Sequence, residues 1–321
     1  MNQTSEFDIC VSIILNQQYI TLCISILNFI FNFMNCIIFI RIVKIDRNNK
    51  LFKLLMIKSI TDAYCGINFL LRSWSMVLKY NSNFFSESKF QMICFLIFSR
   101  YLGFVIQLIS KITECFACFD RLIILKPSYK NKTNFLTKIL YICLIMFSFL
   151  FYIYKFFQNK LVIVELDKTN KTLYTVETDV SSHYLIIDFI HSFLKDFFCL
   201  LLSFAFNILT LIIVIRSSRK RRYLSNLSDS NSTSRGKVDK NDFKIIVMIT
   251  ITTLISGIGH WGNFITFLPI QPNIFMHSCF QSICYYFVEI SYAGNFVIYL
   301  FFNKRFRVIF SDYFSFIKVF N

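Results

Sequence analysis

Long apolar stretches separated by short polar and basic segments make up most of the 321-residue chain. A helix needs about 20 mostly apolar residues to cross the hydrocarbon core of a bilayer. Continuous runs of this length also exclude barrel strands, in which apolar and polar residues alternate over about 10 positions. The pattern therefore predicts an all-α membrane protein, a seven-transmembrane helix bundle with a short interfacial eighth helix. The predicted spans are residues 17–42, 51–78, 91–119, 138–157, 184–215, 243–268 and 275–302.

Composition supports the membrane assignment and excludes other classes of protein. Hydrophobic residues reach 55% and charged residues 16%, with a mean hydropathy of +0.56. Because a soluble domain normally carries about a quarter charged residues, this composition argues against a water-soluble enzyme, and it excludes disordered, collagen-like and low-complexity chains. The net charge of +16 does not indicate a nucleic-acid partner, since the basic residues lie in short tracts between apolar stretches. We expect these tracts to face membrane lipid and a partner protein.

The distribution of Lys and Arg predicts the orientation of the chain. Residues 41–53, 121–138, 216–244 and 303–321 contain 23 of them, whereas the four polar segments between contain five. Basic residues accumulate on the cytoplasmic side. Residues 1–16 are therefore predicted to be an extracellular N-terminus, residues 17–302 a domain in the plasma membrane, and residues 303–321 a cytoplasmic tail with an amphipathic helix. Two glycosylation sequons, at Asn2 and Asn170, fall on the outer side.

The longest predicted cytoplasmic loop, about residues 216–242, begins with a basic run and continues through a series of serines. Two interpretations remain open for it. It is either a solvated connector or a contact for a G protein, in which phosphorylation of the serines would change the local charge.

Polar groups within the spans are costly in lipid, so each of them is a candidate for function. An acid–Arg pair closes the third span, and an amide and a phenol lie four positions apart in the seventh. The candidates are Asn35 in the first span, Asp62 in the second, Asp120 and Arg121 at the end of the third, and Asn295 and Tyr299 in the seventh.

Together these residues resemble the rhodopsin-like G-protein-coupled receptor family over about residues 17–310. Asp120-Arg121-Leu122 is similar to the family's Asp-Arg-Tyr motif, and Trp261 lies in a segment similar to Cys-Trp-x-Pro. Asn295 to Tyr299 is similar to Asn-Pro-x-x-Tyr. The ending Asn-Phe-x-x-Tyr, with Phe-Arg beyond it, is similar to invertebrate FMRFamide-receptor-like proteins and nematode serpentine chemoreceptors.

The resemblance implies that an extracellular ligand shifts the bundle between two packings and that the cytoplasmic face then binds a heterotrimeric G protein. In this scheme Asp120 holds Arg121 until activation. The implied switch residues are Asp120, Arg121, Trp261, Asn295 and Tyr299, and the implied polar network for sodium or water consists of Asn35, Asp62 and Asn295.

Two positions restrict the ligand class within the resemblance. Gly103 stands where amine receptors carry an Asp, and Glu289 stands where retinal proteins carry a Lys. The expected ligand is therefore a neuropeptide or an environmental small molecule. Arg72 and Arg100 suit an anionic or amidated C-terminal group, or else extend to the outer lipid headgroups. The candidate pocket comprises Arg72, Arg100, Gln107, Asp188, His191, Trp261 and Glu289.

The chain departs from the family pattern in ways that leave alternatives open. The fifth, sixth and seventh spans lack the usual Pro, and the second outer loop has no Cys, so an outer disulfide would have to use Cys10, Cys94 or Cys279. A divergent chemoreceptor with impaired or no G-protein coupling is one alternative, and a transporter or channel is another. Lys111 and Glu114 are expected to pair. The sequence lacks catalytic, cofactor and metal-ligand motifs, so it indicates neither an enzyme nor a cofactor or metal site.

Overall fold

The computed structural model of the chain describes residues 3–47, 50–81, 88–124, 134–166, 171–179, 181–227, 251, 254–262, 264–265 and 274–314. Helices predominate because a backbone in lipid must satisfy its own hydrogen bonds. The elements are α1 (Gln3–Ile45), α2 (Lys50–Asn81), α3 (Lys89–Phe95), η1 (Leu96–Tyr101), α4 (Leu102–Ile124), α5 (Asn134–Phe151), α6 (Tyr154–Gln158), β1 (Asn159–Leu166), β2 (Lys171–Thr178), α7 (Ser182–Ser192), η3 (Phe193–Phe198), α8 (Cys199–Leu227), α10 (Ile274–Phe302) and α11 (Lys304–Tyr313).

Six helical segments among the described residues are long and apolar enough to cross a membrane. Each overlaps one of the predicted spans, so the prediction of a mostly helical, multi-pass membrane protein is confirmed in this coarser form. The remaining predicted span, residues 243–268, lies largely outside the described residues, although residues 254–262 are helical. The six segments are Tyr19–Ile45, Lys50–Ser73, Lys89–Ile123, Thr137–Gln158, Ser182–Ser217 and Ile283–Phe302.

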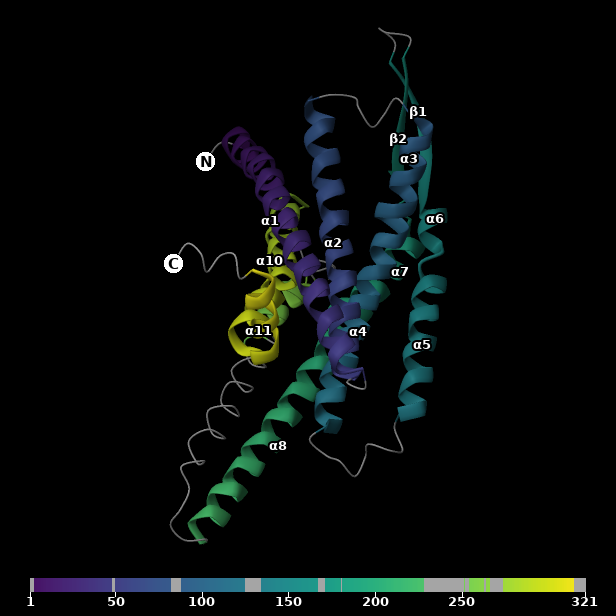
Figure 1. The fold of residues 1–321 in the computed structure, drawn as a ribbon. Helices are drawn as coiled ribbons and strands as arrows, with labels where there is room; N and C mark the ends of the chain where they lie inside the picture. The colour runs from purple at the N-terminus through teal and green to yellow at the C-terminus, as the bar shows by residue number, and fades with distance from the viewer. Residues whose placement is uncertain are drawn as a thin grey trace.

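The helices run alongside one another, with α4 in contact with α2, α5 and α8, and with α1 in contact with α2 and α10 (Figure 1). Gly66 brings α1 and α2 close together, because a Cβ at this position would lie 2.9 Å from the backbone nitrogen of Phe29. Small residues at such crossings let two helix backbones approach in a membrane.

A β-hairpin stands at one end of the bundle, and the sequence pattern did not predict it. β1 and β2 pair antiparallel, with Asn159 opposite Thr178 and Leu166 opposite Lys171. Both strands are rich in β-branched residues, which favour extended backbone. At the opposite end α8 extends beyond its neighbours (Figure 1), and it remains helical to Leu227, within the predicted loop 216–242. Residues 228–242 lie outside the described residues.

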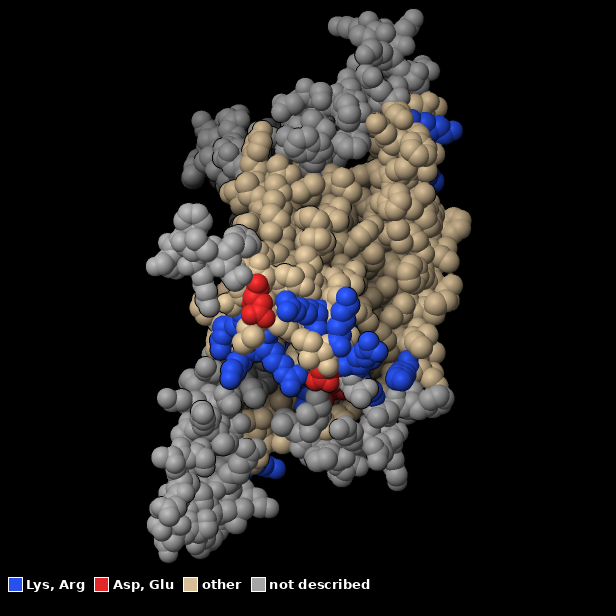
Figure 2. Space-filling view, in the orientation of Figure 1, with Lys and Arg blue, Asp and Glu red and all other residues tan. Residues whose placement is uncertain are grey.

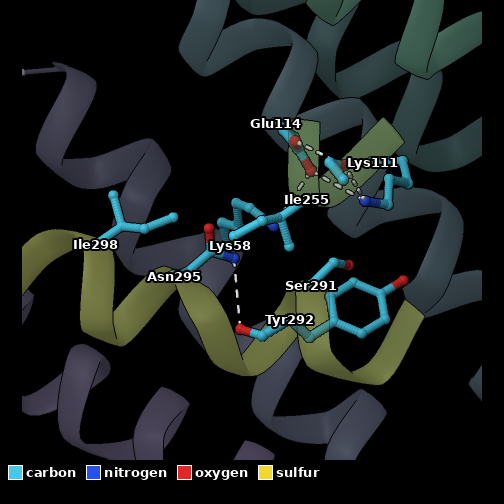
Figure 3. Close-up of a pocket in the computed structure, with 9 residues that line it drawn as sticks. Lys58, Lys111, Glu114, Ile255, Ser291, Tyr292, Asn295 and Ile298 are labelled. Atoms are coloured by element: carbon cyan, nitrogen blue, oxygen red, sulfur yellow. Dashed lines mark hydrogen bonds and ion pairs between the residues drawn. The ribbon is translucent and has the colours of Figure 1, made fainter. Parts of the chain in front are cut away.

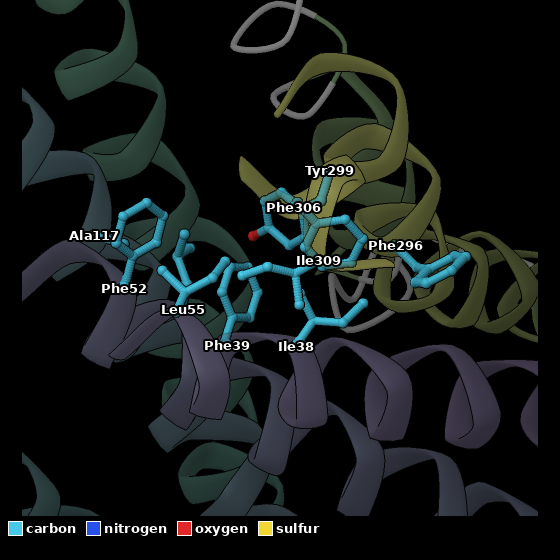
Figure 4. Packing of buried hydrophobic residues seen from close by; sticks show 10 residues of the cluster. Ile38, Phe39, Phe52, Leu55, Ala117, Phe296, Tyr299, Phe306 and Ile309 are labelled. Atoms are coloured by element: carbon cyan, nitrogen blue, oxygen red, sulfur yellow. The ribbon is translucent and has the colours of Figure 1, made fainter. Parts of the chain in front are cut away.

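An aromatic core joins α1, α2, α10 and α11 at the end of the bundle opposite the hairpin (Figure 4). The ring of Phe39 meets that of Tyr299 edge-on at 5.2 Å and lies 5.6 Å from that of Phe306. Asn303 caps α11 by accepting a hydrogen bond from the backbone nitrogen of Phe306 at 3.1 Å. Phe306 and Ile309 then face the core, and Lys304 and Arg305 remain exposed.

The surface of the bundle divides into an apolar part and a basic part. In Figure 2 blue side chains gather around α11 and the adjoining ends of α1 and α2, below a broad tan surface. Exposed side chains of the described residues include many Phe and Ile, such as Phe33 and Ile67. An aqueous surface rarely carries so many large apolar groups in one patch, whereas lipid-facing helices do.

Candidate functional site

Four charged side chains meet near the middle of the bundle, and we call them the inner charge cluster: Lys58, Asp62, Lys111 and Glu114. The Nζ atom of Lys58 lies 2.8 Å from Asp62 Oδ2 on the next turn of α2 and 3.4 Å from Glu114 Oε2 on α4. Lys111 Nζ lies 3.1 Å from the same Glu114 oxygen, which confirms the predicted pair. The charges of two ammonium groups and two carboxylates thus balance in a buried region, where an unpaired charge is energetically unfavourable.

Hydroxyl and amide groups complete the surroundings of the cluster. Ser110 donates a short hydrogen bond to Asp62 Oδ1, and Asn295 Nδ2 of α10 donates to Asp62 Oδ2 at 3.4 Å. Ser256, in the helical segment 254–262, lies 3.5 Å from both Lys111 Nζ and Glu114 Oε1. The cluster therefore connects α2, α4, α10 and this segment through polar contacts that would change if any of these helices moved.

A cavity of about 10 Å³ adjoins the cluster, lined in part by Lys58, Lys111, Glu114 and Asn295 (Figure 3). This volume matches the roughly 10–15 Å³ that a single buried water needs, and the lining supplies polar partners for it. The cavity is too small for an organic ligand. The inner charge cluster is therefore suited to an internal role in the bundle.

The structure brings together part of the polar network that the resemblance implied. Asp62 and Asn295 are in contact, but the cation beside Asp62 is the ammonium group of Lys58. Asn35 belongs to a separate amide row on α1, where its Nδ2 donates to Asn32 Oδ1 at 3.3 Å. Sequence reasoning did not assign Lys58 to the network, although its spacing of four positions from Asp62 on one helix was a usable signal.

A second buried group lies on α7–η3–α8 and the segment 254–262. Asp196 Oδ1 lies 2.8 Å from His260 Nδ1, and Asp196 Oδ2 lies 3.4 Å from Lys195 Nζ. Lys195 also donates to Gln107 Oε1 of α4 at 3.0 Å. Gln107 was a predicted pocket residue, whereas Lys195, Asp196 and His260 were not predicted to act together.

Toward the hairpin end lies a third group, which we call the outer basic group: Arg72, Arg100, Lys155 and Asp188. Asp188 accepts from Lys155 Nζ at 2.5 Å and from Tyr154 Oη at 2.7 Å. Arg72 donates to the carbonyl oxygen of Ser99 at 2.8 Å and to its hydroxyl at 3.2 Å. The structure thus gathers three of the predicted pocket residues and adds Lys155, which sequence analysis did not include.

Two π-helical segments carry several of these charges. Arg100 lies in η1, between α3 and α4, and Lys195 and Asp196 lie in η3, between α7 and α8. A π-helical turn inserts an extra residue into a helix, and such insertions are frequent at functional sites. They shift the faces of α4 and α8 relative to what an uninterrupted 3.6-residue repeat predicts.

The other predicted pocket residues are dispersed. His191 is buried and hydrogen-bonds Tyr152, and Glu289 is buried and accepts from Ser25 at 2.9 Å. Trp261 is 40% exposed, with its ring 6.3 Å from that of Phe204, while the adjacent His260 faces Asp196. The geometry therefore groups Arg72, Arg100 and Asp188, and does not bring Trp261 or Glu289 into contact with them.

The predicted switch residues at the other end of the bundle occupy different surroundings. Tyr299 is packed in the aromatic core, whereas Asp120 and Arg121 are half-buried at the end of α4. Within the part of the chain that the structure describes, no ion pair joins Asp120 to Arg121.

Several remaining predictions concern modification and metal sites. Cys94 is a free thiol, while the side chains of Cys10 and Cys279 and the sequons at Asn2 and Asn170 lie outside the described residues. The described residues contain no group of three His, Cys, Asp or Glu side chains that could hold a metal. Neither the models of known protein families nor the curated proteins yielded a match to this chain.

Proposed function

We propose that this chain is a seven-helix membrane receptor, related to the rhodopsin-like G-protein-coupled receptors, that transmits the binding of an extracellular ligand to a heterotrimeric G protein. The observation that carries the proposal is the series of buried polar groups along the bundle, from the outer basic group to the inner charge cluster. Helices that share such contacts respond together when one of them moves.

The proposed path runs through α4 and α10. A ligand at the outer basic group would act on Arg100 in η1, which continues directly into α4, and α4 carries Lys111 and Glu114 of the inner charge cluster. The cluster contacts Asn295 of α10, one turn before Tyr299 in the aromatic core. Repacking of Tyr299 would then alter the end of the bundle near Arg121, where the G protein is proposed to bind.

We propose that the chain lies in the plasma membrane. In the proposed orientation the hairpin is outside the cell, and the basic ends of α1, α2 and α11 are in the cytoplasm. This choice is supported by the general tendency of Lys and Arg to accumulate on the cytoplasmic side of a membrane, where they interact with anionic lipid. We also propose residues 243–268 as the seventh span, and α11 as an interfacial helix with Phe306 and Ile309 facing the bundle.

A screen of peptides and small metabolites on cells that express the chain with promiscuous G proteins tests the proposal. A hit should give a G-protein response that Arg121→Ala abolishes at unchanged surface expression. Arg47→Ala, an exposed Arg beyond the inner end of α1, is the matched control and should leave the response intact. A normal response from Arg121→Ala would remove the role proposed for that residue.

Epitope tags at the two termini test the orientation separately. In unpermeabilised cells only the N-terminal tag should bind antibody, and a glycosidase should shift the band of the intact protein through Asn2 or Asn170. Accessibility of both tags from one side would rule out a seven-span receptor.

A transporter is the second candidate, because three buried charged groups follow one another along the bundle, as in ion pathways. Ion-dependent uptake of a screen hit into proteoliposomes without any G protein would favour it. A divergent receptor without coupling would instead bind the hit and show neither uptake nor a G-protein response.

A further inference from the structure

Basic side chains gather where the end of α1 meets α11, at the end of the bundle opposite the hairpin. We call them the basic rim: Arg41, Lys44, Lys304, Arg305 and Arg307. Figure 2 shows blue side chains in this region, next to the broad tan surface. Residues 41–47 and 304–313 contain six basic and two acidic residues, so this surface has a positive net charge whatever pairs the two acids form.

The exposed face of α1 places the rim relative to the bilayer. From Ile20 to Ile40 every exposed side chain of this helix is apolar. At about 1.5 Å per residue this face is about 30 Å long, which is the thickness of the hydrocarbon core. The next exposed position is Lys44, in the last turn of α1. Its ammonium group therefore lies at the level of the lipid headgroups.

Contacts in both directions hold α11 at the same level as the end of α1. Arg41 Nη2 lies 3.9 Å from Asp312 Oδ2, and the Arg41 guanidinium carbon lies 5.0 Å from the ring centroid of Tyr313. Arg305 Nη1 of α11 donates to Asp46 Oδ2, just beyond α1, at 3.0 Å. These contacts restrict the positions of two rim guanidinium groups, which lowers the entropic cost of binding an anion between the helices.

Exposed apolar side chains accompany the cations of the rim. Ile45 follows Lys44 at the end of α1, and Val308 lies one turn after Lys304 on α11; both are exposed. A surface for a soluble polyanion has no use for these apolar groups. At a membrane interface, however, apolar side chains enter the acyl boundary while neighbouring cations reach the phosphates. The combination therefore favours lipid as the partner of this surface.

We infer that the basic rim binds the phosphate groups of anionic phospholipids in the adjoining leaflet, and that this binding holds α11 against the end of α1. Guanidinium and ammonium groups both bind phosphate oxygens. Phosphatidylcholine also has a phosphate, but the rim repels its choline cation. The inference goes beyond the proposed function and does not depend on a G protein. Because Phe306 of α11 packs beside Tyr299, the bound lipid would also stabilise the aromatic core.

Native mass spectrometry of the purified full-length chain in detergent tests the inference. The probes are phosphatidylglycerol and phosphatidylcholine with the same acyl chains. The chain should bind phosphatidylglycerol at least about fivefold more tightly than phosphatidylcholine, and added salt should reduce the difference. Equal affinities for the two lipids would overturn the inference.

Two double variants that remove the same charge locate the binding. Lys44→Gln/Lys304→Gln removes two exposed rim cations and should reduce the preference for phosphatidylglycerol by about tenfold. Lys138→Gln/Lys160→Gln removes two exposed cations from α5 and β1 and should leave the preference unchanged. Equal losses in the two double variants, or no loss in the rim variant, would overturn the inference. Should the rim variant prove unstable in phosphatidylcholine nanodiscs, Lys44→Gln alone should still lose about threefold.

Hydrogen exchange and a soluble competitor complete the test. Amides of α11 should exchange more slowly in nanodiscs with phosphatidylglycerol than in phosphatidylcholine alone, and those of α5 at the same rate. Unchanged exchange in α11 would overturn the proposed hold on that helix. Glycerol 3-phosphate should not displace the lipid at equal concentration, and displacement would overturn the assignment to lipid. A lipid preference without any G-protein response would leave the inference standing while the proposed function fails.

Discussion

The inner charge cluster and the outer basic group contain the same kinds of side chain but differ in charge balance. In the inner cluster two ammonium groups meet two carboxylates, with hydroxyl and amide donors around them and a cavity of about 10 Å³. In the outer group Lys155 pairs with Asp188, and the Nε atom of Arg100 has no hydrogen-bond partner among the described residues. The charges of the inner cluster are therefore matched by its own members.

This contrast separates two uses of buried charge in one bundle. The inner cluster connects helices, and each of its charges depends on the others. In the outer group Arg72 donates to Ser99, Lys155 pairs with Asp188, and both cations lie against the ring of Phe104.

The largest expected effect is on the inner cluster. Lys58→Met leaves the Asp62 carboxylate buried beside no ammonium group, and breaking such a pair costs about 3–5 kcal/mol of stability. The double variant Lys58→Met/Asp62→Asn should recover most of the loss, because the remaining pair of Lys111 and Glu114 is balanced. A dye that reacts with buried thiols, such as Cys65, reports the unfolding midpoint.

Lys53→Met, on the same helix and exposed, is the matched control for this measurement. An unchanged midpoint for Lys58→Met would show that Asp62 finds another partner and would remove the distinction between the two groups.

Removal of a charge from the outer group should change the free energy of unfolding less than removal of a charge from the inner cluster, and any sizeable change should be an increase. Arg100→Gln relieves repulsion among the three cations, so its unfolding free energy should change by less than about 1 kcal/mol or rise. Lys111→Gln, the equivalent change in the inner cluster, should lower it by about 3 kcal/mol or more. Similar losses for the two variants would mean that both groups are structural.

A backbone contact beneath the outer group should give an intermediate effect. A Cβ at Gly103 would lie 1.7 Å from Nδ2 of Asn68, a side chain that accepts a hydrogen bond from the Ser99 hydroxyl at 2.8 Å. Gly103→Ala should therefore displace Ser99 and Arg72 and lower the free energy of unfolding by about 1–3 kcal/mol.

Gly294→Ala is the control, since a Cβ there meets nothing within 4 Å. It should stabilise α10 by up to about 1 kcal/mol. Equal unfolding midpoints for the two variants would show that the packing around Ser99 does not depend on Gly103.

The smallest expected effect is a pH dependence at the base of the hairpin. The backbone nitrogen of Ser181 donates to the Asp179 carboxylate at 2.9 Å and holds the pKa of Asp179 below its usual value. Its contribution is therefore complete above the usual pKa of about 3.9 and is lost as the pH falls through the folded value.

Hydrogen exchange at the start of α7 should become faster below about pH 4, with exchange in α2 and α4 unchanged. In Asp179→Asn the pH step should be absent. A step that persists in this variant would assign the titration to another group.

The sequence analysis succeeded where hydrophobic length was decisive and failed where local irregularity mattered. Six of the predicted spans overlap candidate spans of the structure. The hairpin was missed because residues 159–178 were treated as a polar connector, although the runs Leu161 to Val164 and Thr172 to Val176 contain several β-branched residues. Such a run of four or five residues is weak evidence for a strand without knowledge of its partner.

The order of apolar and basic residues along the chain is sufficient to predict a helical membrane protein with polar groups inside its bundle. The reason is that each segment by itself must keep its polar backbone and side chains away from lipid. Which polar groups meet depends on the rotation of each helix about its axis. The π-helical turns, one at Arg100 and one at Lys195 and Asp196, alter that rotation, and no residue spacing in the sequence indicates them. The contact of Lys58 with Glu114 and that of Lys155 with Phe104 therefore emerge only when the helices are packed together.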